Sequence, residues 1–377
     1  MQLPYSEELN IGYLSRLFDS TTNCYKFFWF QAILRKTDEK HTRFSFDELI
    51  NEMVADAWYM VTEYHLRLGP LGITDNLEEV VKYIHENYGF RSSEKREAII
   101  NFLQTTSDKK IIKYKSDLTL NVPYRLQVPF YDEIVIEKNM WGSSKRLLTD
   151  EINRQKRLIY YFSMVSGLGT VIDLDLTWAE YITKNKEILR AWTQLKLIQY
   201  LQNKNPSVPG IADKIEAPVA RDIERVRKYW KFIIQIDPTI RDIYGEVELA
   251  DEKISVDHFV PWQYVAHDEL WNLHPTTKPI NSSKSNSLPS WNMYFTSLGE
   301  LEYRAYELKN SNSLVEKEFN KIAPYHLNNQ EIRNQLYQEG LDKSAFITRL
   351  EHIIRPVYES AQNMGFREWI YDGRDKI

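Results

Sequence analysis

The chain has 377 residues, of which 43% are hydrophobic and 27% charged, and this composition excludes a disordered or fibrous protein. Its single cysteine, Cys24, excludes both an intramolecular disulfide and a Cys-x-x-Cys zinc knuckle. The net charge of −5 is unevenly spread: residues 145–231 hold 16 Lys/Arg against 10 Asp/Glu, a balance of +6, so the remainder carries −11. We therefore expect a local basic surface on a chain that is acidic elsewhere.

The chain shows no sign of export or of membrane insertion. Residues 1–6 lack the basic segment and apolar run of a signal peptide. No stretch approaches the roughly 18 uninterrupted apolar residues of a membrane span. Together with the lone cysteine, this predicts a cytoplasmic protein without a membrane partner.

The first hundred residues have the pattern of amphipathic helices. Apolar residues recur at helical spacing over residues 44–58, and Ser45 with Glu48 three residues later indicates a capping box. Two more helices are predicted over Leu77–Tyr88, ending near Gly89, and over Ser93–Thr105. Residues 109–141 change character, because β-branched residues and prolines there favour an extended or mixed segment.

Residues 144–204 return to a helical pattern, interrupted around residues 167–169. The stretch 175–203 is compatible with one long helix or with two shorter ones. Prolines and a glycine at residues 203–210 indicate a boundary. We therefore divide the chain into a helical N-terminal region (1–205), a central domain (206–310) and a C-terminal helical segment (311–377). Whether residues 1–235 form one domain or two stays open.

The helix predicted over Glu216–Ile236 has two distinct faces. Ile223, Val226, Trp230 and Ile233 fall on an apolar face, as in a helix packed on a core. Its basic face is either solvated or binds a phosphate backbone. That face consists of Arg221, Arg225, Lys228 and Lys231.

After this helix, two short strands are predicted over Arg241–Leu249 and Lys253–Asp257, followed by a loop with one helical patch over residues 258–270. An irregular link then leads to Asn281, which is expected to open a short helix through Lys284. Residues 295–310 and 329–365 are again helical. The expected fold class is mainly α, with one small α+β unit.

The chemistry of the chain is concentrated in that α+β unit. Asp257 and His258 are followed by Asn272, and Asn281 and Lys284 come nine and twelve residues after that. A carboxylate and an amide oxygen are ligands that Mg²⁺ accepts while keeping several waters. A neutral imidazole near its reference pKa of about 6.5 is suited to taking a proton from water. The sequence therefore indicates a metal-dependent site for phosphodiester hydrolysis.

These residues, in the runs 256–261, 271–273 and 280–289, resemble the HNH endonuclease motif of the ββα-metal class. The likeness is closest to the HNH domains of RNA-guided CRISPR effector nucleases and covers about residues 240–292. The resemblance implies that Asp257 and Asn281 bind the metal and that His258 is the general base. It also implies that Asn272 fixes the loop and orients the base, and that Lys284 lies near the phosphate. Many HNH proteins carry two cysteine pairs that bind structural zinc; this chain cannot, so no structural zinc is expected.

The resemblance implies an endonuclease that uses Mg²⁺ or Mn²⁺ to cut DNA, with an RNase or a nickase as an alternative. No second nuclease half or arginine-rich guide-binding helix accompanies the motif, so the chain resembles a standalone effector of bacterial anti-phage or mobile-element systems. A partner protein such as an ATPase or a sensor, and a homo-oligomer, are further expectations. The alternative from a different functional class is a nucleic-acid-binding scaffold that is catalytically silent.

Other polar residues around the motif receive plainer interpretations. His267 and His274 are not expected to bind the metal, because a hard Mg²⁺ site does not call for a second imidazole. Asp268 and Glu269 are interpreted as charges at a helix N-terminus. Lys278 is either a phosphate contact or a solvated lysine.

Overall fold

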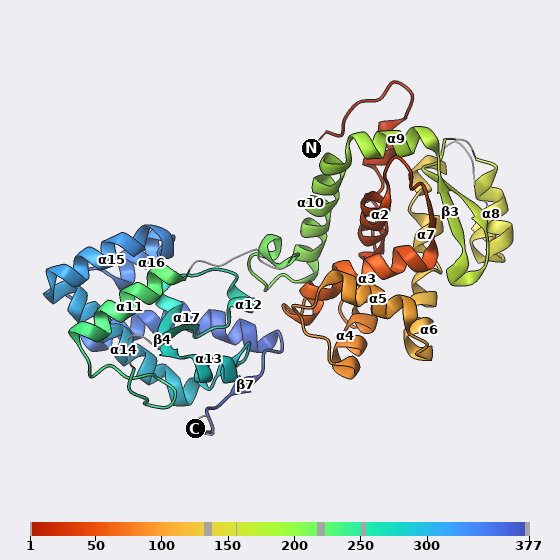
Figure 1. Cartoon of the computed structure of the whole chain (residues 1–377). Coiled ribbons are helices and arrows are strands. Elements are labelled where there is room, and N and C mark those ends of the chain that lie inside the picture. The colour runs from red at the N-terminus through yellow and green to blue at the C-terminus, as the bar shows by residue number, and fades with distance from the viewer. Residues whose placement is uncertain (1, 132–137, 156, 217–222, 250–253, 374–377) are drawn as a thin grey trace. The chain divides into compact units, whose positions relative to one another are not determined.

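The computed structural model describes residues 2–131, 138–155, 157–216, 223–249 and 254–373. Helices dominate these ranges, and the strands form sheets of only two or three members (Figure 1). This confirms the prediction of a mainly α-helical chain with a small α+β part. The chain forms two compact units, an N-terminal unit (Met1–Pro206 and Lys214–Ala217) and a C-terminal unit (Ser207–Asp213 and Pro218–Ile377).

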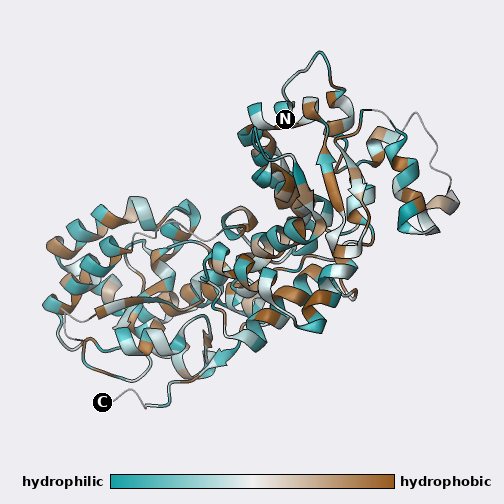
Figure 2. Cartoon of the chain, turned by 45° about the vertical axis from the view of Figure 1, so that its right-hand side comes forward, coloured by the Kyte–Doolittle hydropathy of each residue, from teal (hydrophilic) through white to brown (hydrophobic). Residues whose placement is uncertain are grey.

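Amphipathic helices build both units. Figure 2 shows polar and apolar residues alternating along them, the pattern of helices that bury one side. In the described ranges, every helix is too short or too polar to span a bilayer.

The core of the N-terminal unit forms around α2 (Tyr25–Lys36) and α3 (Phe46–Thr62). The predicted capping box at the start of α3 is confirmed: the Ser45 hydroxyl accepts from the Glu48 N–H, and the Glu48 carboxylate accepts from the Ser45 N–H. Helix α4 ends at Gly89, which adopts the left-handed conformation that favours glycine. The remaining helices of this unit are α1 (Ile11–Ser15), α4 (Asn76–Tyr88), α5 (Arg96–Thr105), α6 (Lys109–Leu118), α7 (Val122–Arg125), α8 (Lys145–Asn153), α9 (Leu176–Lys184) and α10 (Lys186–Lys204).

The predicted extended segment is wrong over residues 109–118, where the chain forms α6. The Asp108 carboxylate accepts hydrogen bonds from the Lys110 and Ile111 N–H groups and thereby caps this helix. Ile111, Lys115 and Leu118 are its buried residues, at spacings of four and three. Capping and helical spacing therefore outweigh the β-branched composition.

The helical pattern predicted over residues 144–204 is interrupted around residues 167–169 as expected, but the prediction is wrong on both sides of that break, where strands form. A three-stranded antiparallel sheet in the order β1-β3-β2 forms from β1 (Arg43–Ser45), β2 (Tyr160–Met164) and β3 (Val171–Leu174). Ile172 lies at the middle of this sheet, opposite Phe44 on one side and Phe162 on the other. Aromatic and β-branched residues suit such a half-buried pleated surface. Beyond it, the stretch 175–203 forms two helices, α9 and α10, which meet at Asn185.

In the C-terminal unit, a short hairpin and the longer helices share one hydrophobic core. The helices predicted as a separate segment from residue 311 pack on the same core as the central region. Trp230, from the predicted helix before the hairpin, donates its indole N–H to the Leu273 carbonyl at 3.0 Å. These elements are α11 (Glu224–Ile236), β4 (Ile254–His258), α12 (Trp262–Val265), β5 (Leu273–Thr277), α13 (Lys278–Lys284), β6 (Leu288–Pro289), α14 (Trp291–Ser311), α15 (Ser313–His326), α16 (Gln330–Leu336), α17 (Lys343–Asn363) and β7 (Glu368–Trp369).

The strand predicted over Arg241–Leu249 is wrong, whereas the strand predicted over Lys253–Asp257 is found as β4 within the described residues. β4 pairs with β5, with Asp257 opposite His274, so the predicted irregular link is partly a strand. Residues 241–249 form a loop that an isolated bridge between Arg241 and Glu248 closes. The Asp242 carboxylate turns this loop by accepting from two backbone N–H groups, at Tyr244 and Gly245.

One buried carboxyl group makes the stability of the C-terminal unit depend on pH. Glu302 of α14 is 3% exposed, and its Oε1 has no hydrogen-bond partner among the described residues. Burial raises the pKa of Glu302 well above its ordinary value of 4.5, and Tyr229 and Tyr337 face it. The folded protein therefore keeps this proton at pH values where the unfolded chain releases it.

We predict that Glu302 lowers the free energy of unfolding as the pH rises above about 4.5, because at this group the folded state keeps a proton that the unfolded chain releases. Glu302→Gln should reduce the dependence of the free energy of unfolding on pH. The stability of this variant relative to the wild type should therefore increase as the pH rises. Urea unfolding between pH about 4.5 and about 8 measures both effects. Glu300→Gln, an exposed position on the same helix, is the matched control, and equal slopes in all three proteins would contradict the prediction.

Candidate functional site

The predicted site residues meet where the hairpin joins its helix. β4 ends at His258, a loop containing α12 returns the chain to β5, and α13 follows directly. Thr277 caps α13 through its hydroxyl, and Pro279 lies in the first turn, where its missing N–H costs no hydrogen bond. This strand–strand–helix order places Asp257, His258, Asn281 and Lys284 in one region of the C-terminal unit.

Asp257 is buried and is surrounded by hydrogen-bond donors. The Tyr244 hydroxyl donates to its Oδ2 at 2.7 Å, and the Lys284 ammonium lies 3.1–3.2 Å from both carboxylate oxygens. Lys284 also donates to the His258 carbonyl at 2.8 Å. Burial lowers the pKa of Lys284, and the Asp257 charge opposes that shift. The lysine predicted near a phosphate is therefore held inside the protein, against the predicted metal ligand.

His258 is paired with a carboxylate that the sequence interpretation assigned to a helix N-terminus. Its Nε2 lies 2.8 Å from Asp268 Oδ1. An ionised carboxylate only accepts, so Nε2 carries the hydrogen, and in the neutral ring the lone pair lies on Nδ1. The interpretation of Asp268 as a helix charge is wrong. In the sequence, nothing distinguishes Asp268 from the neighbouring Glu269. The pairing of Asp268 with His258 is therefore evident only from the fold.

The loop that carries Asp268 is fastened by the end of α15. His326 Nδ1 lies 2.7 Å from the Asp268 carbonyl. The Glu269 carboxylate accepts from the backbone N–H and the side-chain amide of Asn328. Residues more than fifty positions away therefore fix the partner of His258, and no local motif could have indicated them.

Asn272 closes the other end of this loop. It is fully buried, and its amide accepts from the Val260 N–H at 2.8 Å and donates to the Val260 carbonyl at 2.9 Å. The Phe259 N–H donates to the Asn272 carbonyl at 2.9 Å. These bonds fix the backbone immediately after His258, so Asn272 acts on the loop rather than on a reacting atom.

Asn281 ties α13 to β4. Its amide nitrogen donates to the Ser255 hydroxyl at 2.9 Å and to the Val256 carbonyl at 3.0 Å. The half-buried side chain is thereby oriented through its nitrogen, and its carbonyl oxygen remains as a ligand atom. With the Asp257 carboxylate, this gives two oxygen donors of the kind that a hard divalent cation accepts. Among the described residues, no three or more His, Cys, Asp or Glu side chains gather as a metal site, and a carboxylate–amide pair requires no such group.

His274 and Asp242 belong to the frame of the site. Burial lowers the pKa of His274 to about 3, and its Nε2 lies 3.1 Å from the Tyr244 hydroxyl. Asp242 accepts from the Thr276 hydroxyl at 2.9 Å, which attaches the loop 241–249 to β5. His267 instead packs its ring 5.6 Å from that of Trp271.

The predicted basic residues lie on exposed parts of two helices. Arg225 and Lys228 of α11 are exposed and Lys231 is half-buried, whereas Arg221 lies outside the described residues. The Arg225 guanidinium stacks 4.2 Å from the centre of the Tyr325 ring. Lys278 is the exposed first residue of α13.

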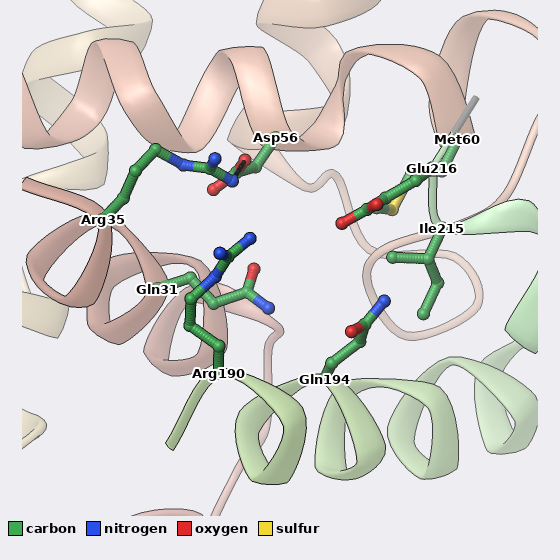
Figure 3. A pocket seen from close by; sticks show the side chains of 8 residues that line it. All are labelled: Gln31, Arg35, Asp56, Met60, Arg190, Gln194, Ile215 and Glu216. Atoms are coloured by element: carbon green, nitrogen blue, oxygen red, sulfur yellow. Dashed lines mark hydrogen bonds and ion pairs between the residues drawn. The ribbon is translucent and has the colours of Figure 1, made fainter. Parts of the chain in front are cut away.

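A separate polar pocket lies in the N-terminal unit, where Arg35, Asp56, Arg190 and Glu216 point toward a common space (Figure 3). The Asp56 carboxylate accepts from Arg35 at 2.8 Å and from Arg96 at 2.5 Å. The cavity has a volume of about 30 Å³, which is room for about one water molecule. Its ion pairs fasten α2, α3 and α5 together, and the pocket is too small for a substrate.

Comparison with known proteins bears on the hairpin region alone. The family model described as HNH endonuclease matches residues 242–290, which span the loop at Asp242, the hairpin, α13 and β6. No curated protein and no solved structure matches the chain, so the closer likeness to CRISPR effector domains stays a prediction. The match contains Asp257, His258, Asn272, Asn281 and Lys284, the residues that the structure brings together. Residues 242–290 are therefore a domain of the HNH family.

Proposed function

We propose that the chain is an endonuclease that hydrolyses phosphodiester bonds of DNA with the help of Mg²⁺ or Mn²⁺. The observation that carries this proposal is the pairing of His258 with Asp268 at the end of β4, the strand that also carries Asp257 and to which Asn281 is tied. A general base and two ligand oxygens are what water activation and phosphate charge neutralisation require. RNA as the substrate, or cleavage of one strand only, is the alternative within the same chemistry.

In this mechanism His258 is the general base. Asp268 holds the hydrogen on Nε2, which leaves the lone pair of Nδ1 to accept a proton from the attacking water. Asp257 and Asn281 would hold the divalent cation, which when bound neutralises charge on the phosphate and on the leaving oxygen. Asn272 keeps the backbone after His258 in place. Lys284 supplies positive charge beside Asp257, and a ligand that approaches this carboxylate must share it with the ammonium.

We further propose that the protein is a cytoplasmic effector of a bacterial defence or mobile-element system. The support is the N-terminal unit, a mainly helical body that is longer than the C-terminal unit and in which the sequence shows no nuclease motif. A partner such as an ATPase or a sensor, or a second copy of the chain, would act through it. The scaffold alternative is disfavoured because Asp257, His258 and Asn281 are all intact.

We predict that His258→Ala lowers the rate of plasmid cleavage by about 10²–10⁴-fold, the usual contribution of a general base. Asp268→Asn should lower it by a smaller factor, about tenfold or more, because the orienting charge is lost while the base remains. Nicking of supercoiled plasmid with Mg²⁺ or Mn²⁺ measures both, and the exposed His352→Ala is the control. Full activity in His258→Ala would remove His258 from the role of base.

We predict that Asp257→Asn and Asn281→Ala raise the metal concentration needed for half-maximal cleavage, because each removes or weakens one oxygen ligand. The measurement is the cleavage rate as a function of Mg²⁺ concentration. Ser282→Ala, an exposed position on the same helix, should leave the titration unchanged. An unshifted midpoint in both ligand variants would show that these side chains do not hold the cation.

We predict that replacing Arg221, Arg225, Lys228 and Lys231 together by Gln flattens the salt dependence of DNA binding. The log–log slope should fall by about 0.9 for each phosphate that these side chains neutralise in the wild type. The control removes four exposed basic residues elsewhere and should leave the slope unchanged. It replaces Lys317, Lys321, Lys343 and Arg355 by Gln. If the salt dependence of DNA binding has the same slope in both variants, the basic residues of α11 do not bind the phosphate backbone.

A further inference from the structure

A pocket opens beside the loop that carries the partner of the catalytic histidine. Its volume is about 670 Å³. His267 and Glu269, which flank Asp268 in the chain, form one wall together with Trp271. The other wall comes from residues 328–332, at the start of α16. Since Asp268 lies 2.8 Å from His258 Nε2, the pocket shares its wall with the catalytic machinery.

The lining of this pocket suits a flat, uncharged group with polar edges. His267 contributes a half-buried ring that packs, with ring centres 5.6 Å apart, on Trp271, which is itself 3% exposed. Asn328, Asn329 and Gln330 bring amides to the opposite wall. One end of each amide is fixed by another group of the protein: the Asn328 nitrogen by Glu269, the Asn329 oxygen by the first N–H groups of α16, and the Gln330 nitrogen by Asn334.

The charges around the pocket disfavour a phosphate as its occupant. Among the described residues that line it, none is a lysine or an arginine, and the carboxylate of Glu269 is already bound by the Asn328 amides. Cationic and stacking groups lie just beyond it instead. Arg225 stacks on Tyr325, which is 56% exposed, and the next residue, His326, holds the Asp268 carbonyl. A guanidinium able to bind a backbone phosphate therefore stacks on Tyr325, three residues before Asn328 of the pocket wall.

We propose that this pocket takes one unpaired nucleobase of the nucleic-acid strand that His258 cleaves. The proposal rests on the nuclease function proposed above and specifies its substrate. A base enters a protein pocket only after it leaves the stacked duplex, and it is then held by stacking and by hydrogen bonds to its edges. The substrate class is therefore nucleic acid with unpaired nucleotides at the cut, either a single strand or a duplex that contains a flipped or looped base.

The test uses the full chain carrying His258→Ala, without metal, so that binding is separated from cleavage. Fluorescence anisotropy compares a labelled single-stranded oligonucleotide with the same sequence as a duplex, at one salt concentration. We expect tighter binding of the single strand. Adding His267→Ala should weaken single-strand binding by at least about fivefold, the loss of one stacked base, and should leave duplex binding unchanged. His352→Ala is the matched control.

A second variant guards against a loss of folding. Gln330→Trp fills the pocket from an exposed position on α16, and it should weaken single-strand binding to a similar extent. If neither pocket variant changes single-strand binding, or if duplex and single strand bind equally, the pocket proposal is overturned. If the pocket behaves as expected but the wild-type chain cleaves no nucleic acid in Mg²⁺ or Mn²⁺, the nuclease proposal fails while the base pocket stands.

Discussion

The buried carboxylate of Asp257 is the constraint on which the rest of the site depends. A charge removed from water is tolerated only where other groups compensate it, and other segments of the chain do so here. Lys284 reaches it from α13, and Tyr244 reaches it from the loop before β4. The need to surround one carboxylate thus brings the helix, the hairpin and the preceding loop together.

The same compensation has a chemical consequence. Lys284 contacts both oxygens of Asp257, so this carboxylate is already neutralised before any cation arrives. A divalent ion at Asp257 therefore replaces or shares an existing interaction instead of entering a bare negative site. Asn281 differs, because the hydrogen bonds that hold it to β4 are made by its amide nitrogen and not by its oxygen. Of the two proposed ligands, Asn281 is held through its nitrogen, whereas Asp257 would have to give up or share its contact with Lys284.

How much of this could be predicted from the sequence depends on whether the signal is local. The capping box at Ser45 and the strand that leads to Asp257 follow from short-range patterns, and both are found. The partner of that strand is mispredicted: residues 241–249 alternate like a strand, but Asp242 bends them into a loop, and β5 pairs with β4. The sheet at β2 and β3 escapes prediction because its partner, β1, lies more than a hundred residues earlier.

Within the site, the motif identifies the residues that contact one another but not those that support them. Asp268 lies in a stretch without distinctive spacing, and its role depends on His326, which is 58 positions away. Likewise, nothing local indicates that Lys284 turns inward to Asp257. Sequence reasoning thus names the groups proposed to carry the chemistry, whereas the long-range contacts that orient them require the fold.

The absence of a cysteine pair in this domain explains why the C-terminal helices share its core. In many HNH proteins a structural zinc crosslinks the unit, and a structural zinc in small domains contributes about 10–16 kcal/mol. Here the corresponding attachments of the loop 241–249 are hydrogen bonds from Asp242 and Tyr244, each of which contributes about 0.5–3 kcal/mol. A handful of such bonds does not replace a metal crosslink, because a two-stranded hairpin by itself is only marginally stable.

The remaining stability must come from apolar burial, and the core that joins the hairpin to α11, α14, α15 and α17 supplies it. The hairpin and the C-terminal helices therefore share one hydrophobic core, and the loop that places Asp268 next to His258 is attached to those helices through His326 and Asn328.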